Sequence, residues 1–386
     1  MLVINIYIGI HGYVFYNSIK LLLKNGKPLL VSRLRGWIYW AVFLAISALY
    51  AFVSFERGLR SLFGLANAYW GIILFFPLLL VLDVGFFSRF LYRFVRRLIS
   101  RIKKEPTAPR IRMPLFTFVS HAIIILIVTC YAVLGIWNAR NPVVTEYHLK
   151  TEKLLPDGLV DGKLEIIMVS DIHIGALVKG ERLSRMVDKI NLLGGDMVLI
   201  AGDLLDRGLE LWEPENLHKS FSHLKAPMGV WAVPGNHDYF SGQLLEFRDK
   251  LADCGVSMLL CEFADLNGIR IIGRSDFTVS RYGQKRKPLS ELTESADRNR
   301  LLIVMDHQPL NLGEAERAGI DLQVSGHTHH GQIWPASIIT GRMFENDYGL
   351  LYKGNSAFIV SSGYGTWGPS LRVGTKSEIV RIVLTN

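Results

Sequence analysis

The sequence predicts an α/β domain over residues 164–386, preceded by an all-α transmembrane region over residues 1–140 and a linker over residues 141–163. Half of the 386 residues are hydrophobic and the mean hydropathy is +0.26, which is high for a soluble enzyme. Long apolar runs lie only before residue 140, whereas after residue 164 short apolar runs repeatedly end in polar clusters. The first pattern is typical of membrane helices, and the second is typical of buried strands in an α/β sheet.

Four apolar stretches account for the predicted transmembrane region. Each is close to the ~20 residues that a helix needs to cross a bilayer. The first is the weakest because polar residues such as Asn5 and Lys20 interrupt it. Aromatic residues such as Trp37, Trp70 and Trp137 lie near the ends of the stretches, as they do at membrane–water interfaces. The four stretches are residues 2–23, 37–55, 69–87 and 115–137.

The distribution of charge predicts the orientation of these spans. Residues 1–149 hold 17 Lys and Arg against 4 Asp and Glu, whereas the remaining residues hold 26 against 30, so the net charge of +9 originates in the apolar part. The loops at residues 24–36 and 88–114 hold most of these cations, and such loops face the cytoplasm. With four spans, the chain after Trp137 leaves the cell membrane on the extracytoplasmic side. The alternative, that the basic loops bind anionic lipid headgroups, stays open.

Five short apolar runs in the second part of the chain are predicted to be strands. Each ends in a polar cluster, and an amphipathic pattern over residues 181–193 predicts a helix after the first run. In open α/β sheets ligands bind outside the carboxyl ends of the strands, which is where these clusters fall. A strand hairpin, Ala357–Ser362 and Glu378–Leu384, is expected to close the chain. The five runs are residues 164–170, 196–201, 229–234, 301–305 and 322–325.

The polar clusters contain side chains that bind divalent cations. Carboxylates, imidazoles and one amide form the ligand set of hard or borderline metals. A single Asp-x-His cluster is common by chance, and a lone buried histidine is more often structural than a ligand. Their joint occurrence at five strand ends therefore predicts one metal centre. Its candidate ligands are Asp171, His173, Asp203, Asn236, His307, His327 and His329.

The residue identities and the order of the clusters indicate a family. The motifs are Asp171-Ile172-His173, Gly202-Asp203-Leu204-Leu205-Asp206, Gly235-Asn236-His237-Asp238, His307, Gly326-His327-Thr328-His329 and, later, Gly363–Pro369. They resemble the calcineurin-like metallophosphoesterase superfamily, most of all its bacterial multi-span membrane-bound members. The resemblance implies a four-layer β-sandwich flanked by helices, with two divalent metal ions about 3.5–4 Å apart. Manganese, iron and zinc are not distinguishable from such ligands.

The resemblance also implies a role for each motif residue. Asp203 would bridge the two metals, because a carboxylate has two oxygens to share. The metals would lower the pKa of bound water, and the resulting hydroxide would attack phosphorus in line. His237 is similar to the family's histidine that stabilises the transition state or protonates the leaving group, and Asp238 would orient it. The expected ligands of the first metal are Asp171, His173 and His329, and those of the second are Asn236, His307 and His327.

The superfamily acts on many phosphoesters, so the fold leaves the substrate open. A domain at the outer face of a membrane predicts hydrolysis of a phosphodiester or pyrophosphate bond in a phospholipid or another envelope compound. A UDP-diacylglucosamine-type pyrophosphatase facing the cytosol is the alternative if the orientation is reversed. A nuclease, a protein phosphatase and a non-catalytic membrane sensor are further alternatives. The acidic domain argues against a nuclease, and the complete ligand set argues against a sensor.

The remaining expectations concern partners and single residues. The expected partners are the lipid bilayer and a phosphoester substrate, without nucleic acid, and the oligomeric state stays open. His330 is a candidate substrate-binding residue, and Asp206 is expected to cap the loop after Asp203. Cys254 and Cys261 are near enough in sequence to pair in an oxidising compartment, although two unpaired thiols are favoured.

Overall fold

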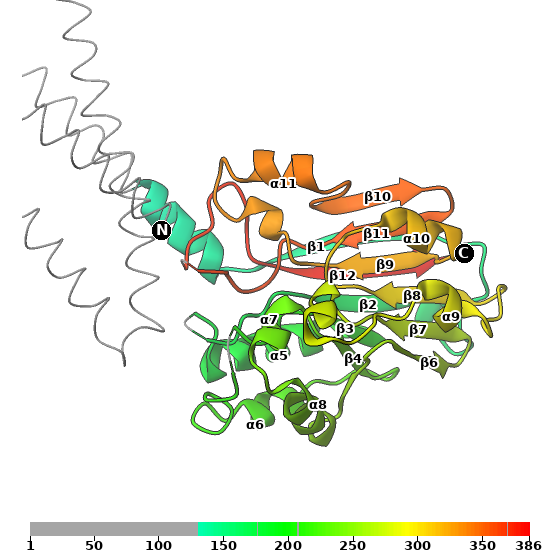
Figure 1. The fold of residues 1–386 in the computed structure, drawn as a ribbon, viewed down its shortest axis with the longest axis horizontal. Coiled ribbons are helices and arrows are strands. Elements are labelled where there is room, and N and C mark those ends of the chain that lie inside the picture. The colour runs from blue at the N-terminus through cyan, green and yellow to red at the C-terminus, as the bar shows by residue number, and fades with distance from the viewer. Residues whose placement is uncertain (1–129, 176, 207, 369) are drawn as a thin grey trace, which may run out of the picture. The chain divides into compact units, whose positions relative to one another are not determined.

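The computed structural model describes residues 130–386 except residues 176, 207 and 369, and shows two six-stranded mixed sheets with helices on both outer sides (Figure 1). The predicted spans before residue 130 lie outside the described residues. Within the described part of the chain, no helix combines the length and the apolar character that crossing a membrane requires. The described region begins in a helix over residues 130–140.

The first sheet has the strand order β1-β12-β2-β3-β4-β5. Strands β2 to β5 run parallel, β12 is antiparallel to β2, and β1 is parallel to β12. The strands are β1 (Val143–Lys150), β12 (Glu378–Thr385), β2 (Leu164–Val169), β3 (Met197–Ala201), β4 (Val230–Val233) and β5 (Val256–Met258).

The second sheet has the strand order β10-β11-β9-β8-β7-β6. Its four inner strands run parallel, and its edge strands β10 and β6 are antiparallel to their neighbours. The strands are β10 (Gly349–Lys353), β11 (Ser356–Val360), β9 (Leu322–Ser325), β8 (Leu301–Met305), β7 (Ile269–Gly273) and β6 (Glu262–Leu266).

Three apolar clusters hold the layers together. Alternate residues of β2, β3, β8 and β9, among them Ile166, Leu199, Ile303 and Val324, form the core between the two sheets. The opposite side chains of the first sheet pack under α5, α6 and α8, and those of the second pack under α9 and α10. Burial on both faces is why these strands are continuous apolar runs. Helix, sheet, sheet and helix thus form four layers, and the predicted α/β class is confirmed.

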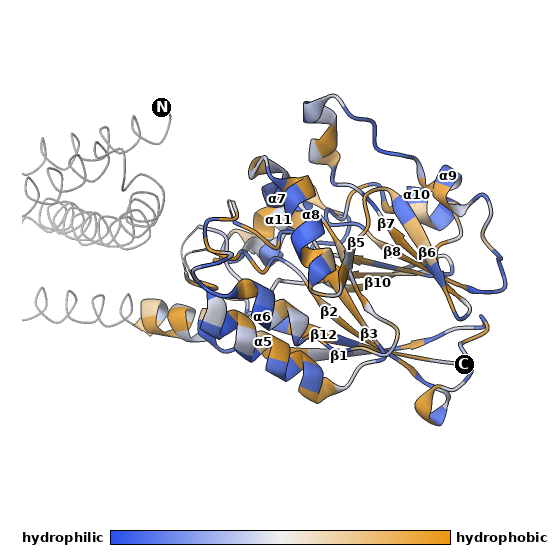
Figure 2. Ribbon diagram, turned by 90° about the horizontal axis from the view of Figure 1, so that it is seen from below, coloured by the Kyte–Doolittle hydropathy of each residue, from blue (hydrophilic) through white to orange (hydrophobic). Residues whose placement is uncertain are grey.

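The helices are short and lie at the surface. Figure 2 shows hydrophilic and hydrophobic residues alternating along α5 and α8, as expected for helices with one face on a sheet. The helices are α5 (Gly180–Leu193), α6 (Leu217–Ser222), α7 (Asn236–Phe240), α8 (Leu244–Asp253), α9 (Leu289–Thr293), α10 (Leu312–Arg317) and α11 (Ser337–Met343). The 3₁₀ helices are η1 (Val160–Gly162), η2 (Phe277–Tyr282) and η3 (His329–Gly331).

Two expectations about the chain's organisation are wrong. The predicted linker over residues 141–163 contains β1, whose side chains alternate between half-buried and exposed along an edge of the first sheet. The expected closing hairpin does not form, because β11 lies in the second sheet and β12 in the first. Two strands that run next to each other in sequence therefore belong to different layers. The cysteines over residues 130–386 are unpaired, as favoured for Cys254 and Cys261.

Candidate metal centre

All seven predicted ligands lie at the carboxyl ends of parallel strands, where the two sheets meet. Asp171 and His173 follow β2, Asp203 follows β3, and Asn236 begins α7 after β4. The second sheet supplies His307 after β8, with His327 and His329 after β9. The loops are joined by backbone hydrogen bonds, since the amide of Asp171 donates to Gly202 and that of His173 to Asp203. The fold therefore brings together side chains as far apart in the sequence as Asp171 and His329.

Asp171, His173 and His329 form a first group of potential ligands. Their nearest ligand atoms all lie within 4.8 Å of one another. His329 Nε2 lies 3.3 Å from Asp171 Oδ1 and 3.1 Å from His173 Nε2. Two ring nitrogens at this separation are stable only with a proton or a cation between them. All three side chains are buried, so solvent does not supply that charge.

Asp203, His307 and His327 form a second group. His307 Nε2 lies 3.2 Å from Asp203 Oδ2, while its Nδ1 lies 2.8 Å from the carbonyl oxygen of Ala201. Because a carbonyl can only accept, Nδ1 donates and Nε2 is the nitrogen left for a metal. Asp203 also lies 3.8 Å from His173 Nε2, so its carboxylate stands between the two groups.

Two buried polar atoms of the predicted ligands have no hydrogen-bond partner. They are Asn236 Oδ1 and His173 Nδ1. Buried polar atoms are almost always paired, so unpaired donor atoms among the predicted ligands indicate a bound ligand. Nitrogen and oxygen donors of this kind suit a divalent metal such as manganese, iron or zinc. The residues present therefore fit a metal centre.

Burial keeps the imidazoles of the first group neutral. It lowers the pKa of His173 to about 3, and together with the neighbouring His173 and the charge of Arg372 it holds the pKa of His329 well below its ordinary value. Burial likewise lowers the pKa of His327 to about 4. A neutral imidazole has a lone pair available for a cation. His173 and His327 are thus uncharged at neutral pH before a cation binds.

The pair of Asp203 and His307 behaves differently. Burial would lower the pKa of His307, but the facing carboxylate of Asp203 raises it well above the ordinary value. Burial would raise the pKa of Asp203, and the same contact instead lowers it well below the ordinary range. In the chain alone a proton on His307 therefore balances Asp203. A cation that binds there displaces this proton.

Glycines in the motifs leave space for ligands from neighbouring strands. A Cβ atom at Gly235 would lie 2.1 Å from Asp203 Oδ1, and one at Gly326 would lie 2.2 Å from Asp171 Oδ2. The ligands themselves adopt strained backbone angles, with φ of 51° at Asp171 and 52° at Asp203. Such strain persists where the surrounding structure imposes it, commonly at functional sites.

Comparisons with known proteins agree with this geometry. A profile described as Calcineurin-like phosphoesterase matches residues 164–331. The chain is 32% identical over 248 residues to an uncharacterized metallophosphoesterase of Helicobacter pylori J99, covering 63% of this chain and 64% of that protein. It is 30% identical over 302 residues to an uncharacterized metallophosphoesterase of Campylobacter jejuni, covering 76% of each. The chain belongs to the calcineurin-like metallophosphoesterase family.

A further relative carries a membrane region in its name. The metallophosphoesterase chain is 27% identical over 329 residues to a transmembrane protein with metallophosphoesterase domain of Danio rerio, covering 82% of this chain and 74% of that protein. The alignment with the Helicobacter pylori protein spans slightly less than two thirds of that relative.

The role expected for Asp238 is wrong. Its carboxylate accepts hydrogen bonds from the amides of Gly235, Leu204 and Leu205, and it is fully buried. It therefore fixes the turn between β4 and α7 and does not orient the ring of His237. The reason is local, because Asp238 is the third residue of the short helix α7 and turns back to its amino terminus.

In this metallophosphoesterase, Asp206 has the position beside the ring of His237 that was expected for Asp238. His237 Nδ1 lies 3.2 Å from the carbonyl oxygen of Asp206 and 3.6 Å from its Oδ1. The same carboxylate lies 3.7 Å from His173 Nδ1, and the amide of His237 donates to Asp203 Oδ1 at 2.8 Å. Asp206 is thus more than a loop cap. The sequence signal was its place in the motif that contains Asp203.

Two further residues border the metal centre. The substrate-binding role expected for His330 stays a prediction. His330 Nδ1 contacts Asp347 Oδ2 at 3.0 Å, and the ring stacks on Tyr348. Arg372, which no motif indicated, is fully buried and its Nη2 lies 3.3 Å from His329 Nδ1. It also donates to the carbonyl oxygens of Ser362, Gly363 and Gly365.

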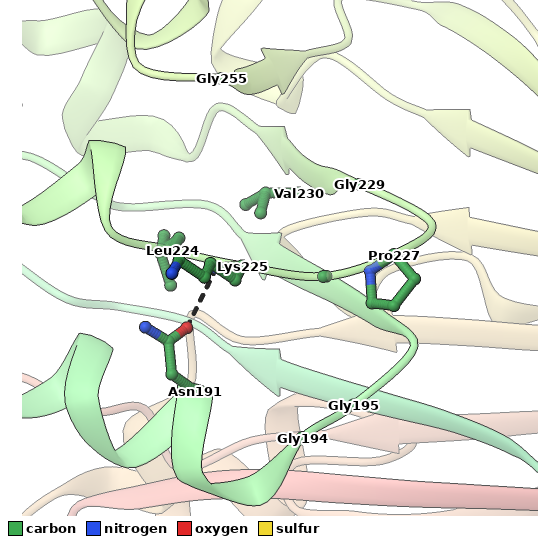
Figure 3. A pocket seen from close by; sticks show the side chains of 10 residues that line it. Asn191, Gly194, Gly195, Leu224, Lys225, Pro227, Gly229, Val230 and Gly255 are labelled. Carbon is green, nitrogen blue, oxygen red and sulfur yellow. Dashed lines mark hydrogen bonds between the residues drawn. The ribbon is translucent and has the colours of Figure 1, made fainter. Parts of the chain in front are cut away.

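A pocket lies at the other end of the strands of the first sheet, away from the metal centre. Figure 3 shows Asn191, Lys225 and Pro227 around it, beside the glycines that precede β3, β4 and β5. The Asn191 side chain accepts from the amide of Lys225 at 3.0 Å and donates to the carbonyl of His223. The pocket contains no predicted ligand of the metallophosphoesterase centre and lies at the amino ends of the parallel strands.

Proposed function

We propose that this protein is a membrane-anchored phosphoesterase with two metal ions, which hydrolyses phosphodiester or pyrophosphate bonds in a phospholipid or another envelope substrate. The observation on which the proposal depends is the position of Asp203 between the two groups of potential ligands. A carboxylate between the two groups would let two cations bind near each other, because its negative charge offsets their repulsion. When bound, the metal ions supply activated water and charge compensation for the phosphoryl oxygens.

The protein's own side chains would bind the metals and transfer a proton. Asp171, His173 and His329 would hold the first metal, and Asn236, His307 and His327 would hold the second. Asp203 belongs to both. His237 is part of neither group in this proposal. Because its Nδ1 donates to the Asp206 carbonyl, its Nε2 is the atom that can receive a proton and return it to the leaving oxygen.

The accessibility of His237 supports this division. The side chain of His237 is 16% exposed, whereas the side chains of His173 and His307 are 1% and 0% exposed. A group that exchanges a proton with the substrate must be reachable, and a group that only holds metal need not be. His330, whose side chain is 31% exposed beside the centre, is placed to contact the substrate.

The membrane setting rests on the sequence. Four apolar stretches precede residue 140, and the basic loops between them favour a catalytic domain outside the cytoplasm. That position favours substrates of the envelope over cytosolic nucleotides. A reporter fused after Asn386 tests it, and an active cytoplasmic reporter would contradict the orientation and favour a cytosolic pyrophosphatase.

The catalytic proposal is tested with the full chain purified in detergent. With manganese it should hydrolyse bis-p-nitrophenyl phosphate, and Asp203→Asn should lower the rate at least about a thousandfold because both metals lose their shared ligand. Asp188→Asn is the matched control, since Asp188 is exposed on α5 away from the centre. Retained activity in Asp203→Asn would sink the two-metal assignment.

A further inference from the structure

An apolar surface lies beside the metal centre. Large hydrophobic side chains on α11 and the turn before it are half exposed or more, and Trp367 nearby is 47% exposed. We call this set the apolar rim. Its members are Trp334, Ile338, Ile339, Met343 and Trp367, with exposed fractions of 59%, 50%, 60%, 68% and 47%.

The apolar rim is fastened directly to the segment that contains the metal ligands. Helix α11 follows η3, which begins at His329. Thr340 of α11 donates to Asp347 Oδ2, the atom that also contacts His330. On the other side, the Gln332 side chain donates to the carbonyl oxygen of Trp367 at 2.7 Å. A molecule seated on the rim would therefore lie next to the metal centre.

The apolar rim also adjoins the helix through which the chain arrives from its apolar part. Tyr131 Oη donates to the carbonyl oxygen of Trp334 at 3.1 Å, and the carbonyl of Gly135 accepts from the amide of Arg372. This helix, over residues 130–140, contains the end of the apolar stretch 115–137, and its Trp137 is 64% exposed. The stretch that is predicted to cross the bilayer thus ends against the rim.

We propose that the apolar rim inserts into the lipid bilayer surface and guides an amphiphilic phosphoester from the membrane into the metal centre. This inference rests on the proposed function and narrows its substrate class to a phosphoester with at least one long apolar chain. A bilayer is favoured as occupant because an apolar stretch long enough to span one leads directly to the rim. Tryptophan beside aliphatic side chains is the composition of surfaces at membrane interfaces.

The rest of α11 supports an interfacial position. Ser337 and Thr340 are half-buried towards the protein, whereas Ile338, Ile339 and Arg342 are exposed. An exposed arginine beside isoleucines can keep its charged end among the headgroups while its stem lies in the apolar layer. At seven residues α11 is too short to anchor the protein, so its contact sets orientation and substrate access instead.

The test compares two phosphodiesters with the same leaving group. Bis-p-nitrophenyl phosphate is soluble, and hexadecyl p-nitrophenyl phosphate resides in vesicles of phosphatidylethanolamine and phosphatidylglycerol. Full-length Ile339→Asp in such vesicles should lose about tenfold in kcat/KM for the hexadecyl ester and nothing for the soluble ester, because a charge replaces an inserted apolar side chain. The matched control is Leu192→Asp, at an apolar residue of α5 that is 87% exposed and outside the rim.

A second readout needs no activity. A fluorophore on Ile339→Cys, in a Cys130→Ser and Cys254→Ser background, should be quenched by brominated lipids in the vesicles, and one on Leu192→Cys should not. Equal effects of Ile339→Asp on both esters, or a label at residue 339 that brominated lipids leave unquenched, would overturn the proposal. The latter would mean that another part of the protein covers the rim. Failure of the catalytic proposal looks different, since the wild type would then hydrolyse neither ester.

Discussion

The two ligand groups of the metal centre are alike in composition but differ in what lies behind their histidines. In the first group, His329 Nδ1 faces the guanidinium of Arg372 at 3.3 Å. In the second group, His307 Nδ1 faces the carbonyl oxygen of Ala201 at 2.8 Å. A carbonyl behind an imidazole raises its basicity towards a metal, whereas a cation lowers it. The comparison implies that, once the proton on His307 is displaced, the second position binds metal more tightly than the first.

The largest expected effect is the change in melting temperature on metal binding, and it tests the role of Asp203, which the two groups share. Removing metal with a chelator leaves the buried carboxylates of Asp171 and Asp203 with only the proton on His307 to balance them. Manganese at about one hundred times its dissociation constant should then raise the melting temperature by roughly 5–10 °C. In Asp203→Asn this rise should be largely absent. A full manganese-induced rise in that variant would show that the groups bind metal independently of Asp203.

The next effect concerns the space around the shared carboxylate. Gly235→Ala should lower the free energy of unfolding by about 2–3 kcal/mol and reduce activity, because its Cβ would lie 2.1 Å from Asp203 Oδ1. Gly341→Ala is the control, since a Cβ there has no neighbour closer than 3.9 Å. Urea unfolding and the rate on the soluble ester measure the two consequences. Equal stability of the two variants would place Asp203 elsewhere than in this structure.

The intrinsic difference between the groups should appear in metal titrations. His307→Ala is expected to weaken the tighter manganese site, and His329→Ala the weaker one, so the first variant loses about tenfold more affinity at the tighter step. Calorimetry of the metal-free protein resolves the two steps. If His329→Ala removed the tighter step instead, the cation behind His329 would not determine the order of binding.

The sequence predicts those residues of the centre that strand ends place, and it fails for residues whose contacts depend on local turns or on loop packing. The ligands were found because each follows an apolar strand directly, so strand ends alone place Asp171 and Asp203 together. Asp238 was misassigned because a residue next to His237 in sequence turns away from it within one helical turn. The contact of Arg372 with His329 was not foreseen, because it depends on how the last loop packs. The strand β1 was missed because only half of its alternating side chains are even partly buried.

The smallest effect distinguishes the two aspartates near His237. Asp206→Asn keeps the backbone carbonyl that accepts from His237 Nδ1 but removes the negative charge 3.6 Å away, so the imidazolium that protonates a leaving group is less stable. The rate should fall about three- to tenfold for a methyl ester and hardly at all for p-nitrophenolate, which needs no proton. Asp238→Asn should instead lower stability without any dependence on the leaving group, because Asp238 holds backbone amides only. A leaving-group dependence in Asp238→Asn, and none in Asp206→Asn, would restore the role that the sequence first indicated.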